Sequence, residues 1–294
     1  MTSTRIPLLK IAAWFSSILP DSVKRLLYRI PFLAKPIRRA LNAAAPDGLA
    51  DVEIAAGPAR GLHMMLDLHA EKDYWLGTYE PDLRHAAEKW INAGDVVYDV
   101  GANIGYISLL CASLVGARGF VYAFEALPAN IARLSTNVKL NDLSEIVTFT
   151  HAAVTEQNTP VTFYIHRSGA MGKAAGSAGR DEKYQDSITV DGLSMDRFVF
   201  TDGNPAPALI KIDIEGGEGN ALKGAQRLLS AHQPILLIEL HGEVAARQVW
   251  DILISHQYHI YALQAGYPRI HSVDQLDWKA YILAAPASRT DYLT

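Results

Sequence analysis

Short apolar runs and amphipathic segments alternate along the chain from residue 96 onward. The apolar runs have the length of buried strands, and the segments after most of them have the spacing of helices with an apolar face. Such alternation predicts an α/β fold with a mostly parallel sheet, covered by helices on both faces. We expect strands at 96–100, 120–124, 146–151, 208–214 and 235–240, and helices at 104–115, 128–140, 218–231 and 244–255.

The ends of this alternating region differ from its middle. Two late strands, at 258–263 and 279–284, have no helix clearly between them, so we expect an antiparallel hairpin at one edge of the sheet. Before the first strand, the sequence predicts a small β segment around 52–66 and a helix at 81–92 that begins with proline.

Residues 155–207 interrupt the alternation. This insertion contains a predicted strand at 161–165, a loop rich in Gly, Ala and Ser at 168–179, and a strand with a short helix within 187–200. An insertion of this length at the strand ends is typical of a lid or substrate loop.

The first 42 residues are basic and amphipathic. They contain eight Lys or Arg and one acid, a net charge of +7, so the remaining 252 residues carry −11 of the total −4. Such a segment packs on the domain as a helical arm or lies on an anionic membrane surface. We expect an arm at 1–48 and one domain at 49–294, with peripheral membrane contact through 1–42 as the alternative to simple packing.

Composition narrows the class of protein. With 294 residues, 49% of them hydrophobic, the chain can build a core and is not a disordered protein. No apolar run is long enough for a conventional membrane span, and a net charge of −4 argues against a nucleic-acid-binding protein. The single cysteine, Cys111, can form neither an internal disulfide nor a Cys-rich zinc site, which is typical of the reducing cytoplasm.

The first motif that carries chemistry follows the strand at 96–100 and reads DVGANIGY. Its small residues, Gly101 and Gly105 among them, let the backbone turn sharply and approach a ligand. About 20 residues on, the carboxylate of Glu125 can accept both hydroxyls of a ribose, so the two features indicate a nucleoside cofactor. Asn103 replaces the middle glycine of the dinucleotide pattern, and Asp99 would repel a pyrophosphate.

A cofactor with an ammonium and a sulfonium would instead be attracted by Asp99, which favours S-adenosylmethionine over NAD. The alternative is an ordinary turn between strand and helix, in which Asp99 caps the helix.

Two further motifs place charged side chains at strand ends. Lys211, Asp213 and Glu215 alternate with apolar residues, so they would point the same way. Buried charges are costly unless they pair, meet solvent or take part in catalysis. Glu239 and His241 end the next strand. Because open α/β sheets bind ligands at the carboxyl ends of their strands, we expect these groups to converge on one crevice.

Residues 50–285 resemble the FkbM-type family of class I S-adenosylmethionine-dependent methyltransferases. KIDIEG with a downstream LxGA is fairly specific for this family, whereas the glycine turn alone is not. The chain departs from the family at Ala126, where proline often follows the glutamate. The motifs that carry the resemblance are WLGTYEP (75–81), DVGANIGY (99–106), AFE (123–125), HAAV (151–154), KIDIEGGE (211–218), LKGA (222–225) and IELH (238–241).

The resemblance implies a Rossmann-like class I methyltransferase sheet and methyl transfer to a hydroxyl or carboxyl oxygen of a sugar, glycolipid or related natural product. Asp213 and His241 are the expected general bases, and Glu215 is expected to hold the substrate loop. Alternatively, His241 only orients Glu239, and Asp213 only forms a salt bridge with Lys211. The expected cofactor-binding residues are Asp99, Gly101, Asn103, Gly105, Glu125, His151, Ala152, Tyr79 and Glu80.

Other interpretations stay open at this point. Asp213, Glu239 and His241 together offer ligands that suit magnesium or manganese better than zinc, so a divalent metal is an alternative. An NAD-linked nucleotide-sugar oxidoreductase or epimerase would need a different glycine turn, and a non-catalytic membrane-associated module would not need the acidic residues. The expected partner is a small-molecule, glycan or glycolipid acceptor and no nucleic acid, in the cytoplasm or at the inner face of the membrane.

Overall fold

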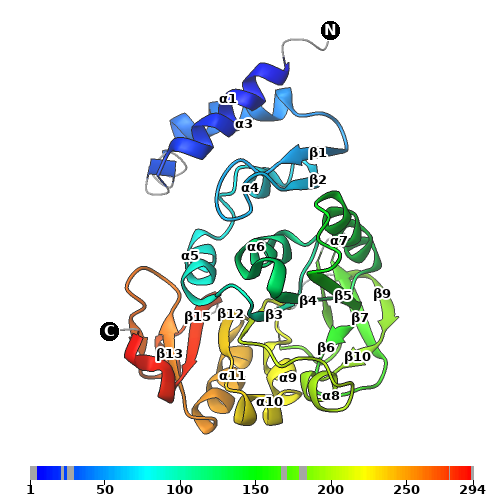
Figure 1. Cartoon of the computed structure of the whole chain (residues 1–294), viewed down its shortest axis with the longest axis vertical. Coiled ribbons are helices and arrows are strands. Elements are labelled where there is room, and N and C mark those ends of the chain that lie inside the picture. The colour runs from blue at the N-terminus through cyan, green and yellow to red at the C-terminus, as the bar shows by residue number, and fades with distance from the viewer. Residues whose placement is uncertain are drawn as a thin grey trace.

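An eight-stranded sheet organises the part of the chain that the structure describes, with strand order β14-β13-β15-β12-β11-β3-β4-β5 (Figure 1). The computed structural model describes residues 5–20, 23–24, 30–166, 171–178, 184–277 and 279–292. The strands of this sheet are β3 (Val96–Val100), β4 (Phe120–Glu125), β5 (Val147–His151), β11 (Leu209–Ile212), β12 (Ile235–His241), β13 (Tyr258–Ala262), β14 (Arg269–Ile270) and β15 (Lys279–Pro286).

The sheet is parallel from β12 through β11, β3 and β4 to β5, which confirms the predicted α/β architecture. β15 pairs antiparallel with both β12 and β13, as expected for the late strands. However, β15 lies inside the sheet, and the edge is β14, a two-residue strand that was not predicted. Because β15 runs opposite to β12, its amino end lies beside the carboxyl end of β12.

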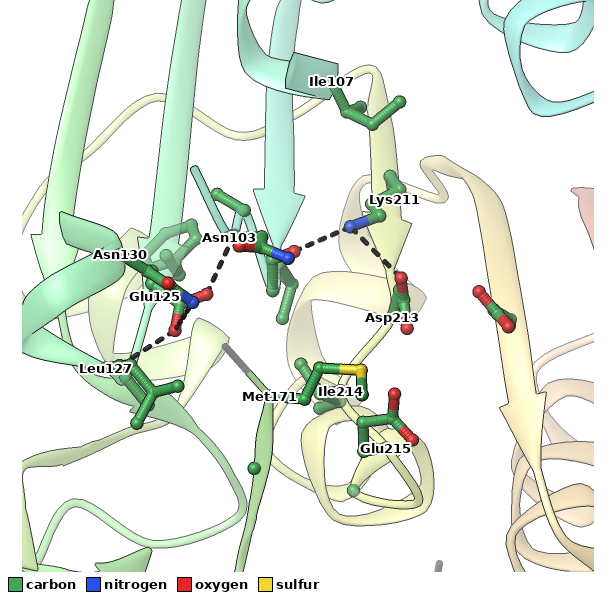
Figure 2. Close-up of a pocket in the computed structure, with 18 of the residues that line it drawn as sticks. Asn103, Ile107, Glu125, Leu127, Asn130, Met171, Lys211, Asp213, Ile214 and Glu215 are labelled. Carbon is green, nitrogen blue, oxygen red and sulfur yellow. Dashed lines mark hydrogen bonds and ion pairs between the residues drawn. The ribbon is translucent and has the colours of Figure 1, made fainter. Parts of the chain in front are cut away.

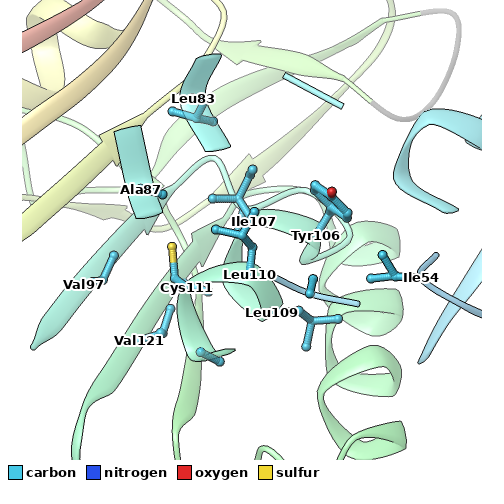
Figure 3. Close-up of a cluster of buried hydrophobic side chains, with 14 of the residues drawn as sticks. Ile54, Leu83, Ala87, Val97, Tyr106, Ile107, Leu109, Leu110, Cys111 and Val121 are labelled. Carbon is cyan, nitrogen blue, oxygen red and sulfur yellow. The ribbon is translucent and has the colours of Figure 1, made fainter. Parts of the chain in front are cut away.

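Helices cover both faces of the sheet, which explains why the strands are apolar throughout. In β3, Val97 belongs to the core under α5, α6 and α7, whereas Tyr98 belongs to the core under α8 to α11. Figure 3 shows the first of these cores, where Cys111 of α6 lies toward Val97 and Val121. The helices are α5 (Pro81–Trp90), α6 (Tyr106–Val115), α7 (Pro128–Leu140), α8 (Met195–Phe200), α9 (Glu218–Lys223), α10 (Gln226–Ala231) and α11 (Glu243–Ser255), with 3-10 turns η1 (Gly116–Arg118), η2 (Val273–Gln275) and η3 (Ala287–Tyr292).

One predicted helix is two helices in the structure. The segment expected at 218–231 is divided into α9 and α10 at Gly224. A Cβ at Gly224 would lie 2.3 Å from the carbonyl oxygen of Thr155, so the break lets the chain pass close to the start of the insertion. β11 also ends earlier than expected, at Ile212, which leaves Asp213 in the turn that follows.

The insertion contributes a small second sheet beside the first. Strand β7 pairs antiparallel with β8 and β9, and a short parallel pair, β6 with β10, joins the insertion to the domain. Within the Gly/Ala/Ser-rich loop predicted at 168–179, Gly172–Ala174 form strand β8. Residues 168–170 and 179 of this loop lie outside the described residues. The strands are β6 (Ala153–Val154), β7 (Val161–His166), β8 (Gly172–Ala174), β9 (Tyr184–Val190) and β10 (Gly192–Leu193).

Among the described residues of the amino-terminal part, helices α1 and α3 and a β hairpin lie at the opposite end of the molecule from α10 (Figure 1). Ser16 of the first helix donates a hydrogen bond of 2.6 Å to the carbonyl oxygen of Leu76, and Leu41 of the second helix belongs to the core. Among the described residues, no helix combines the length and apolar character needed to cross a membrane. The division at residue 48 stays a prediction. The elements are α1 (Arg5–Ile18), α3 (Pro31–Ala44), β1 (Leu49–Glu53), β2 (His63–Asp67) and α4 (Lys72–Trp75).

Candidate active site

A cavity of about 540 Å³ lies at the carboxyl ends of β3, β4, β11 and β12. Its walls include residues of the segment 73–80 and residues of the insertion such as Met171. Figure 2 shows Glu125 on one side of the cavity and Asp213 with Glu215 on the other. The strand ends that the sequence predicted to converge do so, at the edge where open α/β sheets bind ligands.

The turn between β3 and α6 lets two strand ends approach each other. Gly101 has a φ of +78°, and a Cβ there would lie 1.9 Å from the carbonyl oxygen of Asp213, so only glycine fits. Asn103 has a φ of +50°, and both residues line the cavity. Gly105, with a φ of +93°, is outside the described lining, and a Cβ there would lie 3.1 Å from Cγ of Leu134. Gly105 therefore serves helix packing.

Glu125 faces the cavity with both carboxylate oxygens held in place. Oε2 accepts a hydrogen bond of 2.8 Å from the N–H of Asn103, and Oε1 accepts one of 2.8 Å from the N–H of Leu127. The side chain of Asn130 donates a longer bond of 3.4 Å to Oε1. Burial raises the pKa of Glu125, and the hydrogen bonds oppose that rise by stabilising the charged form. The carboxylate is thus oriented to accept further hydrogen bonds, such as those of a diol.

The two residues predicted beside β5 have different positions. Ala152 lines the cavity, and its N–H donates a hydrogen bond of 3.1 Å to the carbonyl oxygen of Glu125. His151 is outside the described lining, and its Nε2 lies 2.9 Å from the carbonyl oxygen of Ala126. His151 therefore braces the loop after β4, and its predicted contact with adenine stays a prediction.

Asp99 lies beneath the cavity and is outside its described lining. Its buried carboxylate accepts a hydrogen bond of 2.6 Å from Ser108, and its Oδ1 lies 3.2 Å from Nζ of Lys211. The register of β11 against β3 places these two residues opposite each other. The ammonium beside Asp99 is therefore that of Lys211, and the structure does not show the direct cofactor contact that the sequence predicted for Asp99.

Lys211 connects Asp99 to the cavity. Its Nζ donates a hydrogen bond of 2.8 Å to the carbonyl oxygen of Gly101 and lies 3.9 Å from Asp213 (Figure 2). Burial lowers the pKa of Lys211, but the charges of Asp99, Asp213 and Glu80 outweigh burial and raise it. Lys211 is consequently a fixed positive charge at the base of the acidic end of the cavity.

The acidic end contains carboxylates with opposite pKa shifts. Burial raises the pKa of Asp213; Lys211 opposes the rise, Glu239 and Glu80 add to it, and the result is about 8. Burial also acts to raise the pKa of Glu239, but hydrogen bonds from His241 and Lys279 lower it to about 2. At neutral pH, Glu239 is therefore ionised, whereas Asp213 is poised to exchange a proton.

His241 lies behind these carboxylates and is outside the described lining of the cavity. Its Nδ1 lies 2.9 Å from Glu218, and its Nε2 lies 3.3 Å from Glu239 and 3.7 Å from Glu215. Burial lowers the pKa of His241, but its bonds to Glu218 and Glu239 outweigh burial and raise the pKa to about 10. A protonated imidazole cannot accept a proton, so this arrangement favours Asp213 over His241 as the base and fits the alternative in which His241 orients Glu239.

The three residues that the sequence offered as metal ligands lie close together at the acidic end of the cavity. Asp213, Glu239 and His241 each offer one ligand atom, and these atoms lie within 4.8 Å of one another. A metal would need their electron pairs free. Glu239 already accepts a hydrogen bond from Lys279, and the two ring nitrogens of His241 lie 2.9 Å from Glu218 and 3.3 Å from Glu239. The groups that could bind a metal are therefore already paired with other side chains of the protein, so they do not fit a metal site.

An aromatic wall closes the cavity beside Glu80. The ring centroids of Tyr74 and Tyr79 are 4.5 Å apart, and those of Tyr74 and Tyr106 are 4.9 Å apart. Burial raises the pKa of Tyr79, so its phenol stays neutral, and it is hydrogen-bonded to Glu80. Tyr79 and Glu80, which were predicted to bind the cofactor, both line the cavity, and Tyr79 also packs against Tyr74.

Sequence reasoning missed four residues that shape the site. Lys279 and Tyr281 line the cavity from β15, because the register places Tyr281 opposite Glu239 and Lys279 opposite His241. No sequence signal indicated that β15 inserts beside β12. The other two are Glu218, which holds His241, and Asn130, which holds Glu125. Glu218 follows the KIDIEGG run directly and was the one that could have been suspected.

The mostly parallel sheet, with its cavity at the strand ends, defines the chain as a Rossmann-like α/β protein. The sequence model of the methyltransferase FkbM domain matches residues 99–265, which include the glycine turn, Glu125 and the whole acidic end up to His241. The chain belongs to the FkbM methyltransferase family, and it is a methyltransferase. This membership rules out the oxidoreductase and non-catalytic alternatives.

Two characterised relatives are similar to the chain. Hexuronic acid methyltransferase AglP of Haloferax volcanii is 27% identical over 159 residues, which cover 54% of this chain and 61% of the relative. 31-O-demethyl-FK506 methyltransferase FkbM of Streptomyces tacrolimicus is 25% identical over 246 residues, covering 74% of this chain and 89% of the relative. The chain thus matches less than two thirds of the length of AglP.

Solved structures of methyltransferases are also similar. A methyltransferase FkbM from Methylobacillus flagellatus has a TM-score of 0.46 and 21% identity, over 74% of this chain and 53% of that one. An O-methyltransferase from Thermotoga maritima has a TM-score of 0.42 and 14% identity, over 71% of this chain and 65% of that one.

Proposed function

We propose that this methyltransferase uses S-adenosylmethionine and transfers the methyl group to an oxygen of a sugar, glycolipid or related natural product. One observation carries the proposal. A single cavity has at one end a carboxylate oriented by backbone N–H groups, Glu125, and at the other a carboxylate with a pKa of about 8, Asp213. The first suits the ribose of a nucleoside, and the second suits removal of a hydroxyl proton.

The cofactor end is built to hold a nucleoside. Both oxygens of Glu125 are fixed by the N–H groups of Asn103 and Leu127, so the carboxylate does not have to reorganise when the ribose hydroxyls donate to it. Ala152 lines the wall beside Glu125, where the base of the nucleoside would lie. Glu80, next to Tyr79, lines the cavity and can accept a hydrogen bond from the ammonium of the cofactor; burial raises the pKa of its carboxyl.

The acceptor end is built to remove a proton. The bound cofactor supplies an electrophilic methyl group, and an acceptor hydroxyl must lose its proton as its oxygen bonds to that methyl. Asp213 takes the proton on a carboxylate oxygen, because its pKa of about 8 is close to the working pH. Lys211 lies 3.9 Å from Asp213, and the N–H of Asp213 donates a hydrogen bond of 3.1 Å to the carbonyl oxygen of Val100. These contacts hold Asp213 in place, which aligns the acceptor and lowers the entropic part of the barrier.

The class of acceptor is inferred from the relatives. One relative is named for a hexuronic acid, and the other is named for 31-O-demethyl-FK506. In this chain, the insertion lines the cavity through Phe163, Met171 and Ser177, so it is placed to contact the acceptor. A hydroxyl is favoured over a carboxyl oxygen, because an acceptor carboxylate is already ionised and needs no base.

The proposal is tested with S-adenosylmethionine that carries a radioactive methyl group. Uronic acid glycosides, glycolipid extracts and hydroxylated macrolides are offered as acceptors, and the label is followed before and after mild alkali. Alkali hydrolyses methyl esters but not methyl ethers, so alkali-stable label on an acceptor supports transfer to a hydroxyl. Alkali-labile label would move the site to a carboxyl. Absence of transfer to all of them by an enzyme that binds the cofactor would contradict the acceptor class.

A further inference from the structure

The large apolar side chains that stay exposed are concentrated in the first helix. Leu8, Ile11, Phe15 and Ile18 of α1 are all exposed, and their spacing of three and four residues aligns them along one side of the helix. Trp14, 58% exposed, lies three residues after Ile11 and widens this row. We call these five side chains the outer stripe.

The opposite side of α1 contacts the domain. Leu9, Ala12 and Ala13 pack against the core of the domain, and Ser16 donates its hydrogen bond to Leu76. α1 is therefore apolar on two sides, of which one is covered by the domain. A helix that is apolar all round is normally buried, so the outer stripe needs an apolar surrounding of its own.

The second helix adds an exposed ring among positive charges. Phe32 of α3 is 75% exposed, and Lys35 and Arg39 follow at spacings that place them on its side of the helix. Arg38 of α3 and Lys10 of α1 are exposed as well. In the sequence from residue 1 to 46, eight Lys or Arg accompany a single acidic residue. The exposed charged side chains that the structure describes on α1 and α3 are thus all positive.

We propose that α1 and α3 bind the surface of an anionic lipid bilayer. The outer stripe and Phe32 enter the boundary between headgroups and acyl chains, while Lys10, Lys35, Arg38 and Arg39 face the lipid phosphates. A bilayer offers apolar surface and negative charge together. A second copy of the chain is a poorer occupant, because it would bring two segments of net charge +7 against each other.

The position of α1 connects this surface to the cavity. Leu76, which accepts the hydrogen bond from Ser16, belongs to the same short segment as Tyr79 and Glu80, which line the cavity. Binding at the outer stripe would hold the cavity near the headgroups, where a glycolipid acceptor is presented. This last step rests on the proposed function, whereas the binding of the bilayer does not.

The test is flotation of the full-length protein with vesicles, without cofactor or acceptor. One set of vesicles is phosphatidylcholine alone, and the other is equal parts phosphatidylcholine and phosphatidylglycerol. Trp14→Ser with Phe15→Ser removes the centre of the outer stripe, and Phe120→Ser with Val244→Ser removes two apolar side chains of similar exposure elsewhere. Lys35→Gln with Arg38→Gln and Arg39→Gln removes charge, and Arg118→Gln with Lys139→Gln and Lys223→Gln is its matched control.

We expect salt-sensitive binding to the anionic vesicles alone. The outer-stripe variant should bind about tenfold more weakly or worse, and the charge variant about 100-fold more weakly, at roughly fivefold per cation. Both controls should bind like the wild type. A folded wild-type protein that does not float with anionic vesicles overturns the proposal, and so does binding that neither variant weakens. Loss of a dimer in the outer-stripe variant, without lipid binding by the wild type, would assign the stripe to a second copy instead.

Discussion

Glu125, which is buried, and Asp213, which is partly buried, are carboxylates at the two ends of one cavity, and the protein holds them by different means. Glu125 is fixed by neutral donors, the backbone N–H groups of Asn103 and Leu127. Asp213 is surrounded by charges, with Lys211 on one side and Glu239 and Glu80 on the other. Burial raises the pKa of both carboxylates; hydrogen bonds oppose the rise at Glu125, whereas neighbouring carboxylates add to it at Asp213, whose pKa is about 8.

The difference separates binding from chemistry. Fixed neutral donors keep an acceptor of hydrogen bonds in one geometry, which suits recognition of a ribose. Burial and the neighbouring carboxylates raise the pKa of Asp213 toward the working pH, which makes its carboxylate a stronger base. The cofactor end should therefore respond to mutation in affinity, and the acceptor end in rate and pH dependence.

The largest expected effect is on the rate when the base is removed. Asp213→Asn keeps the size of the side chain but cannot take the hydroxyl proton, so kcat should fall by about 10²–10⁴-fold. The control is Asp251→Asn, an exposed carboxylate on α11. Steady-state kinetics with the acceptor found in the transfer assay measures both. A variant that keeps most of its kcat would remove Asp213 from the chemistry.

A large effect on stability is expected when His241, which lies behind the acidic end of the cavity, is replaced. His241→Ala leaves the buried carboxylate of Glu218 without its cationic partner, so the free energy of unfolding should fall by about 3–5 kcal/mol. The pKa of His241 is raised from 6.5 to about 10, so its contribution is complete below pH 6.5 and is lost as the pH rises through about 10.

Urea denaturation of wild type and His241→Ala at neutral and alkaline pH checks this prediction. The gap between the two proteins should narrow toward pH 10. A gap that stays constant with pH would show that the imidazole is neutral in the folded protein.

The pH dependence of kcat should be a smaller effect than the loss caused by Asp213→Asn, but it tests the assignment of Asp213 as the base more specifically. Because Asp213 must be ionised to take a proton, kcat should rise about tenfold per pH unit and level off near the pKa of about 8. Asp213 lies at the other end of the cavity from Glu125, so its titration should change kcat more than cofactor affinity. Initial rates and calorimetry across this range measure the two curves. A rate that does not rise with pH would contradict the assignment of the base.

The smallest expected effect is that of metal removal. Lys279 and His241 already neutralise Glu239, so dialysis against a chelator should leave kcat unchanged. The same assay with magnesium or manganese added back is the check. A loss of activity that the added ion restores would reinstate the metal alternative.

The strands and the two carboxylates could be predicted because local features specify them. A run such as 96–100 is apolar throughout since both faces of β3 are buried, and Glu125 and Asp213 stand where parallel strands end. The partners of these groups could not be predicted, because they depend on strand order. Lys211 meets Asp99 across β11 and β3, and Lys279 reaches Glu239 only because β15 inserts antiparallel beside β12.

The most direct test of the central claim is calorimetry of S-adenosylmethionine binding to the wild type, Glu125→Gln and Asp213→Asn, with NAD as a control ligand. The account predicts that the wild type binds S-adenosylmethionine and not NAD. Glu125→Gln should weaken binding by about 10–100-fold, since hydrogen bonds to a charged group are worth about 1.5–3 kcal/mol. Asp213→Asn should cause a smaller loss. Binding that survives Glu125→Gln unchanged but fails in Asp213→Asn would contradict the division of the cavity into a cofactor end and an acceptor end.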